Sequence, residues 1–182
     1  MIIGSAIMDL VLQATAVEVA REEVERGVRE ESSNWSPRIA EYIRNLDPPL
    51  DFPIPYCAAF VQFCTDMAAQ TLRLENPLDQ VKREAYVADY WAWARDHNLV
   101  VPDLELVRPG DLIVFSFGGT RKDHIGFVET PGSPAVTTLE ANTSPGDEGS
   151  QRDGQGVHRK LRSVYGPGVE FIRWGPLALE SE

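Results

Sequence analysis

Apolar residues recur at helical spacing in the first part of the chain. Between residues 7 and 28 they repeat every three or four positions, with charged residues on the opposite side, which predicts a long first helix that fades near Gly27. The apolar stripe consists of Ile7, Leu10, Val11, Ala14, Val17, Val24 and Val28. A capping serine, Ser36, followed by Pro37 predicts the start of a short second helix.

A third helix is predicted to begin at Cys57, after an approach stiffened by prolines. Apolar residues follow the cysteine at spacings of three and four, so one buried stripe starts beside it. These residues are Phe60, Val61, Cys64 and Ala68. Free N–H groups and the positive dipole end at a helix N-terminus favour thiolate over thiol, which makes Cys57 a candidate nucleophile. Cys64 lies two turns further on, too far for a disulfide, and is expected to be a buried apolar residue.

The character of the chain changes after a fourth helix, predicted over residues 81–97. Short β-rich runs separated by turn residues predict five strands, at 112–117, 124–130, 135–141, 156–163 and 169–174. Helices followed by antiparallel strands predict an α+β fold, with N-terminal helices packed on a C-terminal antiparallel sheet. The aromatic residues of the fourth helix are expected to be mostly core, with one lining a cleft. Residues 143–155, rich in Gly, Ser and Asp, are expected to form a mobile loop.

Candidate partners for the cysteine lie on the second and third strands. His124 opens the second strand, and Glu140 and Asn142 share one face near the end of the third because they are two residues apart. In a hairpin, pairing residue 130 with 134 or 136 puts His124 opposite Glu140 or Asn142, whereas pairing it with 135 puts His124 opposite Ala141. We predict one of the first two registers, or a bulge equivalent to it.

These residue types fit the hydrolysis of an amide. A cysteine that attacks an amide needs a base to hold its proton and an acid to protonate the leaving amine, and one histidine serves both purposes. A carboxylate or amide on the other ring nitrogen, here Glu140 or Asn142, fixes the orientation of the imidazole. The backbone N–H of Cys57 is a candidate oxyanion donor. A zinc site is not predicted, because the two cysteines and His124 lack the usual ligand spacing.

Six segments together resemble the CHAP amidases and their NlpC-type relatives, papain-like cysteine peptidases that act on bacterial peptidoglycan. The segments are residues 27–30, 39–42, 55–61, 109–115, 124–129 and 139–143. The resemblance implies a papain-like domain over residues 1–182, with a helical part at 5–98 and a sheet part at 109–175. It implies Cys57 as nucleophile, His124 as base, Glu140 as the residue that orients the histidine, and Asn142 as a further polar member of the site.

Two features of the sequence depart from the pattern of these relatives. Tyr56 stands where many of them have tryptophan before the cysteine, and we expect it to keep an aromatic wall that binds substrate. Some relatives bind calcium through aspartates just before the cysteine, but Asp47 and Asp51, set among prolines, do not reproduce a ligand run. We therefore predict no metal and no cofactor.

The expected function is cleavage of an amide bond in peptidoglycan through a thioester acyl-enzyme on Cys57. Two alternatives stay open at this point. One is an amidase or acyltransferase of the same fold that acts on a substrate outside the wall. The other is a non-catalytic interaction module, in which the thiol would show no unusual reactivity.

Charge and composition narrow the partners and the location. A net charge of -11 over 182 residues argues against binding to nucleic acid or to anionic membranes. We expect neither a signal peptide nor a membrane span, and two unpaired cysteines suggest a reducing compartment. We expect synthesis in the cytoplasm and action on the wall after release. A phage-type lysis protein would leave through a holin pore, and a toxin-like effector through contact-dependent secretion, together with a dedicated inhibitor protein.

Overall fold

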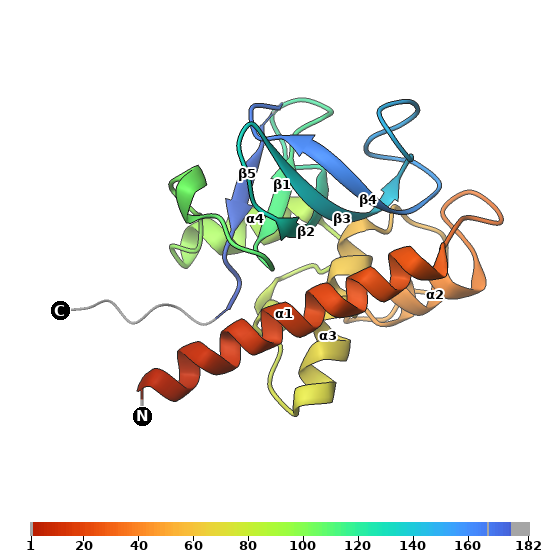
Figure 1. Ribbon diagram of the computed structural model, residues 1–182. Helices are drawn as coiled ribbons and strands as arrows, with labels where there is room; N and C mark the ends of the chain where they lie inside the picture. The colour runs from red at the N-terminus through yellow and green to blue at the C-terminus, as the bar shows by residue number, and fades with distance from the viewer. Residues whose placement is uncertain (1, 167, 176–182) are drawn as a thin grey trace.

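The computed structural model describes residues 2–166 and 168–175, and it places helices before strands along the chain (Figure 1). The helices are α1 (Ile2–Arg26), α2 (Pro37–Arg44), α3 (Cys57–Leu72) and α4 (Val87–Asp96), with short 3₁₀ turns at Pro77–Gln80 and Leu104–Leu106. The strands are β1 (Leu112–Phe115), β2 (His124–Thr130), β3 (Ala135–Thr143), β4 (Gly156–Ser163) and β5 (Glu170–Ile172). The predicted α+β order, N-terminal helices followed by a C-terminal sheet, is confirmed.

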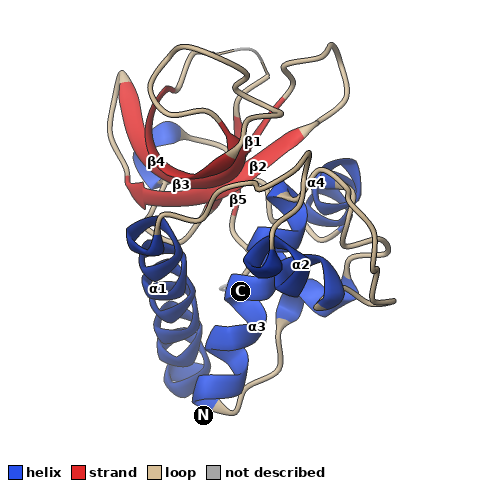
Figure 2. Cartoon of the chain, turned by 90° about the vertical axis from the view of Figure 1, so that its right-hand side faces the viewer, coloured by secondary structure: helices blue, strands red, loops and turns tan. Residues whose placement is uncertain are grey.

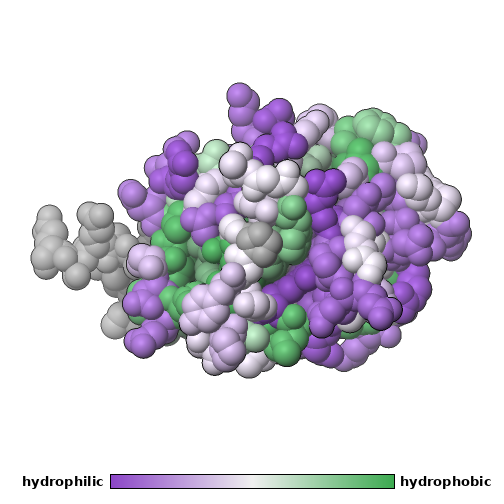
Figure 3. All heavy atoms as spheres, turned by 90° about the horizontal axis from the view of Figure 1, so that it is seen from above, coloured by the Kyte–Doolittle hydropathy of each residue, from purple (hydrophilic) through white to green (hydrophobic). Residues whose placement is uncertain are grey.

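The five strands form one antiparallel sheet in the order β4-β3-β2-β1-β5. Figure 2 shows the sheet curving above α1, α2 and α3. Side chains alternate along each strand, so Phe127 and Leu139 join the core shared with the helices, while Val128 and Val136 belong to a second apolar cluster. Both faces of the sheet are therefore packed. Seen from above the sheet, most of the surface is hydrophilic, with smaller apolar areas (Figure 3).

Helix α3 is the centre of the packing. It contacts α1 and α2 as well as strands β2 and β3 (Figures 1 and 2). The predicted buried stripe is confirmed, since Phe60, Val61 and Cys64 have no exposed surface. This burial holds the first turn of α3, and Cys57 with it, against the sheet.

Helix α1 ends where the sequence predicts, one residue before Gly27, but its buried face differs from the predicted stripe. Val17 is buried as expected, whereas Ile7, Leu10 and Val11 are 40–54% exposed. The first turns of α1 extend beyond the helices and strands that cover the rest of it (Figure 1), so the apolar pattern continues past the part of the helix that is packed. The buried face shares Val17 with the predicted stripe and otherwise carries Leu12, Ala16 and Ala20.

The fourth helix begins later than predicted, at Val87 rather than residue 81. Residues 81–86 form turns instead, in which Tyr86 is extended and the Arg83 guanidinium binds both carboxylate oxygens of Asp89 at 2.7 and 2.8 Å. Tyr90 and Trp93 are buried and Tyr86 is half exposed, which confirms the prediction of core aromatics with one at a cleft.

Within the described residues, no helix combines the length and apolar character needed to cross a membrane. The five strands lie within two residues of their predicted bounds at either end. Residues 144–155 contain bends and no strand, and their mobility stays a prediction.

Candidate active site

Cys57 is the first residue of α3 and lines a cleft of about 520 Å³. The residue before it is not helical, and the first helical hydrogen bond runs from the N–H of Phe60 to the carbonyl of Tyr56 at 2.9 Å. The backbone N–H of Cys57 therefore belongs to the open end of the helix. Segments 46–55, 82–88, 121–123 and 152–153 supply the walls of the cleft.

The register of β2 and β3 follows one of the two predicted alternatives. Gly126 pairs with Glu140 and Val128 with Thr138, which is the register that pairs residue 130 with 136, and a bulge after Val128 shifts the end of the hairpin. Continued by two residues, this register puts position 124 opposite position 142. The prediction of one of these registers, or a bulge equivalent to it, is confirmed over Gly126–Thr130.

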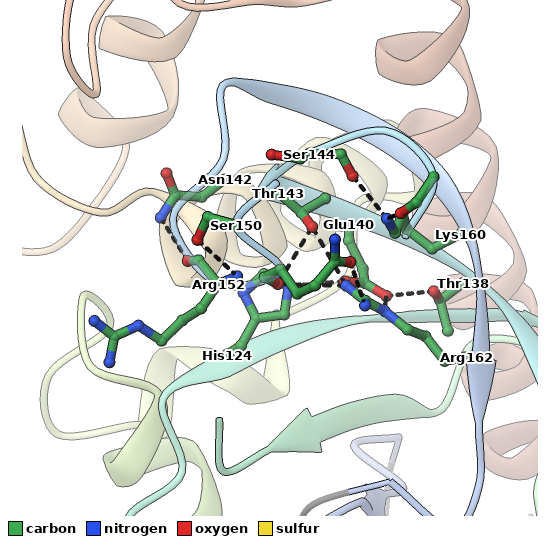
Figure 4. A network of polar contacts seen from close by, with 12 residues as sticks. His124, Thr138, Glu140, Asn142, Thr143, Ser144, Ser150, Arg152, Lys160 and Arg162 are labelled. Atoms are coloured by element: carbon green, nitrogen blue, oxygen red, sulfur yellow. Dashed lines mark hydrogen bonds and ion pairs between the residues drawn. The ribbon is translucent and has the colours of Figure 1, made fainter. Parts of the chain in front are cut away.

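Within this register, His124 bonds to Glu140 rather than to Asn142. The ring nitrogen Nε2 donates to Glu140 Oε2 at 2.8 Å, and both side chains are fully buried (Figure 4). Gly126 stands directly opposite Glu140, and a Cβ there would lie 2.6 Å from Glu140 Cγ. The absence of a side chain at Gly126 lets the Glu140 side chain lie across β2 and reach His124 along the diagonal.

Asn142 has a different environment. Its side-chain Nδ2 donates to the backbone carbonyl of Arg152 at 3.1 Å, and its backbone carbonyl accepts from the N–H of Gly154 at 2.9 Å. Its backbone is left-handed, with φ of 60°, at the irregularity that ends β3. The side chain of Asn142 thus holds the loop after β3 (Figure 4), while the contact to the histidine is made by Glu140.

The second ring nitrogen of His124 remains for the cysteine. Nδ1 is buried and forms no hydrogen bond with a described residue. The ring interacts with the Cys57 side chain. Burial favours the neutral ring, but the interactions with Cys57 and Glu140 outweigh it and raise the pKa of His124 to about 9. The rings of Phe115 and Phe117 flank the imidazole at centroid distances of 5.8 and 5.9 Å. The contacts of the ring with Cys57 and Glu140 therefore favour its protonated form.

Glu140 is itself held by two further residues (Figure 4). Arg162 of β4 binds both of its oxygens, with Nε 2.8 Å from Oε1, and Thr138 Oγ1 donates to Oε1 at 2.5 Å. Burial alone would raise the pKa of Glu140, but Arg162 and then His124 outweigh that effect and lower it to about 2. Glu140 is consequently ionised throughout the physiological range.

Arg162, Thr138 and Gly126 were not predicted from the sequence as members of this site. Alternation along β3 would have placed Thr138 on the face of Glu140. Arg162 pairs with Val136, four residues before Glu140, and reaches the carboxylate only because its long side chain runs along the sheet. The pairing of β3 with β4 was needed to find it.

The expected substrate-binding role of Tyr56 does not agree with the structure. Tyr56 has no exposed surface and belongs to the main core cluster, so its ring gives substrate nothing to touch. Burial raises the pKa of its hydroxyl. The aromatic residues that do line the cleft are Tyr86 and Phe52, which are 52% and 55% exposed.

Among the residues that the structure describes, no three His, Cys, Asp or Glu side chains gather as metal ligands would. Asp51 instead bonds to Arg44, with 2.8 Å between Arg44 Nε and Oδ1.

The site thus combines a cysteine at the start of a buried helix with a histidine and a carboxylate on an antiparallel sheet. The sequence model of the CHAP domain family matches residues 49–142, more than half of the chain, and the chain belongs to this family. Members of the family are in general amidases or peptidases, and peptidoglycan is their substrate. Neither the curated proteins nor the solved structures gave a significant match.

The space at Gly126 can be tested by Gly126→Ala. A Cβ would lie 2.8 Å from the carbonyl oxygen of Leu139, which is backbone and cannot move aside, so we expect a loss of about 2 kcal/mol in the free energy of unfolding. The imidazole resonances of His124 in NMR spectra should shift as the bond to Glu140 lengthens. Gly166→Ala, where the nearest contact is 3.1 Å, is the matched control. Equal stability of the two variants would contradict this account of Gly126.

The ion pair of Arg162 and Glu140 predicts how the free energy of unfolding depends on pH. Because the pKa of Glu140 is lowered from 4.5 to about 2 on folding, its contribution to stability is full above about pH 4.5 and is lost as the pH falls to 2. Arg162→Gln should therefore destabilise the protein by about 3 kcal/mol at pH 7, and the gap to wild type should narrow between pH 4.5 and 2.

Urea unfolding at several pH values measures this gap. Arg44→Gln, which removes an exposed pair with Asp51, should change stability by less than about 1 kcal/mol at every pH. A gap for Arg162→Gln that stays constant down to pH 2 would show that Glu140 does not depend on Arg162 for its charge.

Proposed function

We propose that this protein is a cysteine-dependent hydrolase that cleaves an amide bond of peptidoglycan through a thioester on Cys57. The observation that carries the proposal is the buried His124, whose Nε2 is held by the ionised Glu140 carboxylate and whose ring interacts with Cys57. Family membership supports the class of substrate. We further propose that residues 1–182 act as one CHAP/NlpC-like domain, because Arg162 lies outside the matched segment and yet binds Glu140 within it.

In the first half of the proposed reaction, the Cys57 thiolate attacks the carbonyl carbon of the scissile amide. The carbon–sulfur bond forms, and the oxyanion of the tetrahedral intermediate accepts a hydrogen bond from the backbone N–H of Cys57. His124 then gives the proton on Nδ1 to the nitrogen of the amide as the carbon–nitrogen bond breaks. The amine leaves, and the acyl group remains on the sulfur as a thioester.

In the second half, water hydrolyses the thioester. The neutral His124 takes a proton from water at Nδ1, and the oxygen attacks the thioester carbonyl. When the carbon–sulfur bond breaks, a carboxylic acid is released and Cys57 returns as a thiolate beside the imidazolium. Glu140 remains ionised through both halves, so it orients the imidazole of His124 and stabilises the positive charge of that ring.

We propose an indirect role for Asn142, as a residue that anchors the loop after β3 beside the cleft. Its bond to the main chain of Arg152 supports this role, since Arg152 lines the same cleft as Cys57. Action on the wall after release from the cytoplasm, and the dedicated inhibitor protein, stay predictions.

The requirement for Cys57 is tested on isolated sacculi. Wild-type protein should release wall fragments that mass spectrometry identifies by the newly formed amine and carboxylate, and Cys57→Ala should reduce the release by about a thousandfold or more. Cys64→Ala is the matched control, because Cys64 is fully buried in the core and should leave the rate within about twofold. Fragment release that persists in Cys57→Ala would overturn the mechanism.

The pairing of Cys57 with His124 predicts a pH dependence of alkylation by iodoacetamide. Below about pH 9 the ring of His124 is positively charged and stabilises the thiolate, so Cys57 should react about tenfold faster in wild type than in His124→Ala at pH 7. The difference should shrink as the pH rises through 9, because the ring then loses its charge. Both proteins carry Cys64→Ala, so that one thiol is measured. Equal rates at pH 7 would contradict a charged partner for Cys57.

A further inference from the structure

Five acidic side chains are buried among the described residues, and one of them differs from the others. Four have an arginine partner within ion-pair distance, as expected for a carboxylate removed from water. These pairs are Glu23 with Arg38, Asp111 with Arg173, Glu129 with Arg159, and Glu140 with Arg162. Glu84 is 5% exposed and forms no ion pair with a described residue.

The contacts of Glu84 leave one oxygen without a partner. Oε2 accepts the backbone N–H of Asp47 at 2.7 Å, which fixes the carboxylate, whereas Oε1 receives no hydrogen bond from a described residue. The side chain of Glu84 lines the cleft that contains Cys57. Oε1 is therefore available to a group that enters this cleft.

The surroundings of Glu84 add further negative charge. Asp47 lines the cleft beside it, and Asp66 and Asp79 lie behind, where amide groups of Asn45, Asn76 and Gln62 satisfy their oxygens. Burial first, and then these carboxylates, raise the pKa of Glu84 to about 7. A positive charge placed at Oε1 would relieve the repulsion, as arginine does at the other four buried acids.

Glu84 is close to the reacting centre without being part of it. The hydroxyl of Tyr90, which donates to Gln62 at 3.1 Å, lies near enough to both Glu84 and Cys57 that each raises its pKa. Arg121 and Arg152 also line the cleft, where Arg152 is paired with Asp123. Lys82 and Arg83 line it next to Glu84, and Arg83 is paired with Asp89. The cleft therefore carries charges of both signs, and Glu84 is the buried acid among its lining residues.

We propose that Glu84 forms a subsite for a free ammonium group of the substrate, so that the preferred substrate is a wall peptide with an unmodified side-chain amine. This inference rests on the proposed function, which identifies the cleft as the substrate site. The ammonium would donate one hydrogen bond to Oε1 and would take the place that an arginine occupies beside each of the other buried acids. A bound metal is a poorer fit, because the described acidic side chains do not converge as ligands.

The test uses Cys57→Ala protein, so that binding is measured without turnover. Two probes are compared by calorimetry: a muramoyl tetrapeptide with lysine as its third residue, and the same peptide with the lysine amine acetylated. We expect the free amine to bind about tenfold tighter. Adding Glu84→Gln, which keeps an oxygen for the Asp47 N–H, should abolish this preference, while Glu22→Gln on the exposed side of α1 should retain it.

Each other outcome overturns the subsite. Equal affinity for the two probes, or no binding of either, would do so without relying on any Glu84 variant. A preference that survives Glu84→Gln would place the ammonium elsewhere. Saturable calcium binding that depends on Glu84 would show that Glu84 binds a metal ion and not an ammonium group.

The outcome for the subsite is separable from that for the proposed function. Cleavage of sacculi that depends on Cys57, combined with equal probe affinities, would overturn the subsite alone. Failure of wild type to cleave sacculi would overturn the proposed function, even if the binding preference were found.

Discussion

The ion pair between Glu140 and Arg162 is the interaction on which the geometry of the candidate site depends. A carboxylate without exposed surface is stable in its charged form only with a close partner, and Arg162 binds both of its oxygens. The charge on Glu140 in turn fixes Nε2 of His124 and favours the protonated ring beside Cys57. Three strands, β2, β3 and β4, contribute to this chain of contacts, so the sheet and the charge state of the histidine are maintained together.

The cysteine reaches this chain from the other layer of the fold. Helix α3 is enclosed by α1, α2 and the sheet, and its buried side chains leave it little freedom to move. Only its first turn meets the cleft. A nucleophile at that position lies beside the free N–H groups of the helix start and is held by a tightly packed helix. A reaction that needs a fixed attack geometry requires such a rigid position.

Charge within the cleft is arranged by a similar rule. Every buried acid with an internal arginine has its charge compensated before any ligand arrives, and those acids serve the architecture or the histidine. Among the described residues Glu84 has no such partner, and it lines the cleft, so we propose that a bound ligand compensates its charge. This difference between the buried acids is the basis of the recognition role proposed for Glu84.

The sequence by itself determined the order of helices and strands and the start of α3 at Cys57, and it narrowed the β2–β3 register to two alternatives, with His124 opposite Glu140 or Asn142. These follow from local periodicity, capping and alternation, which act over a few residues. Only the tertiary structure decided that Glu140 rather than Asn142 bonds the imidazole, because that choice depends on the missing side chain at Gly126. The roles of Arg162 and Glu84, the burial of Tyr56 and the exposed start of α1 arise from contacts between distant segments, which no local pattern records.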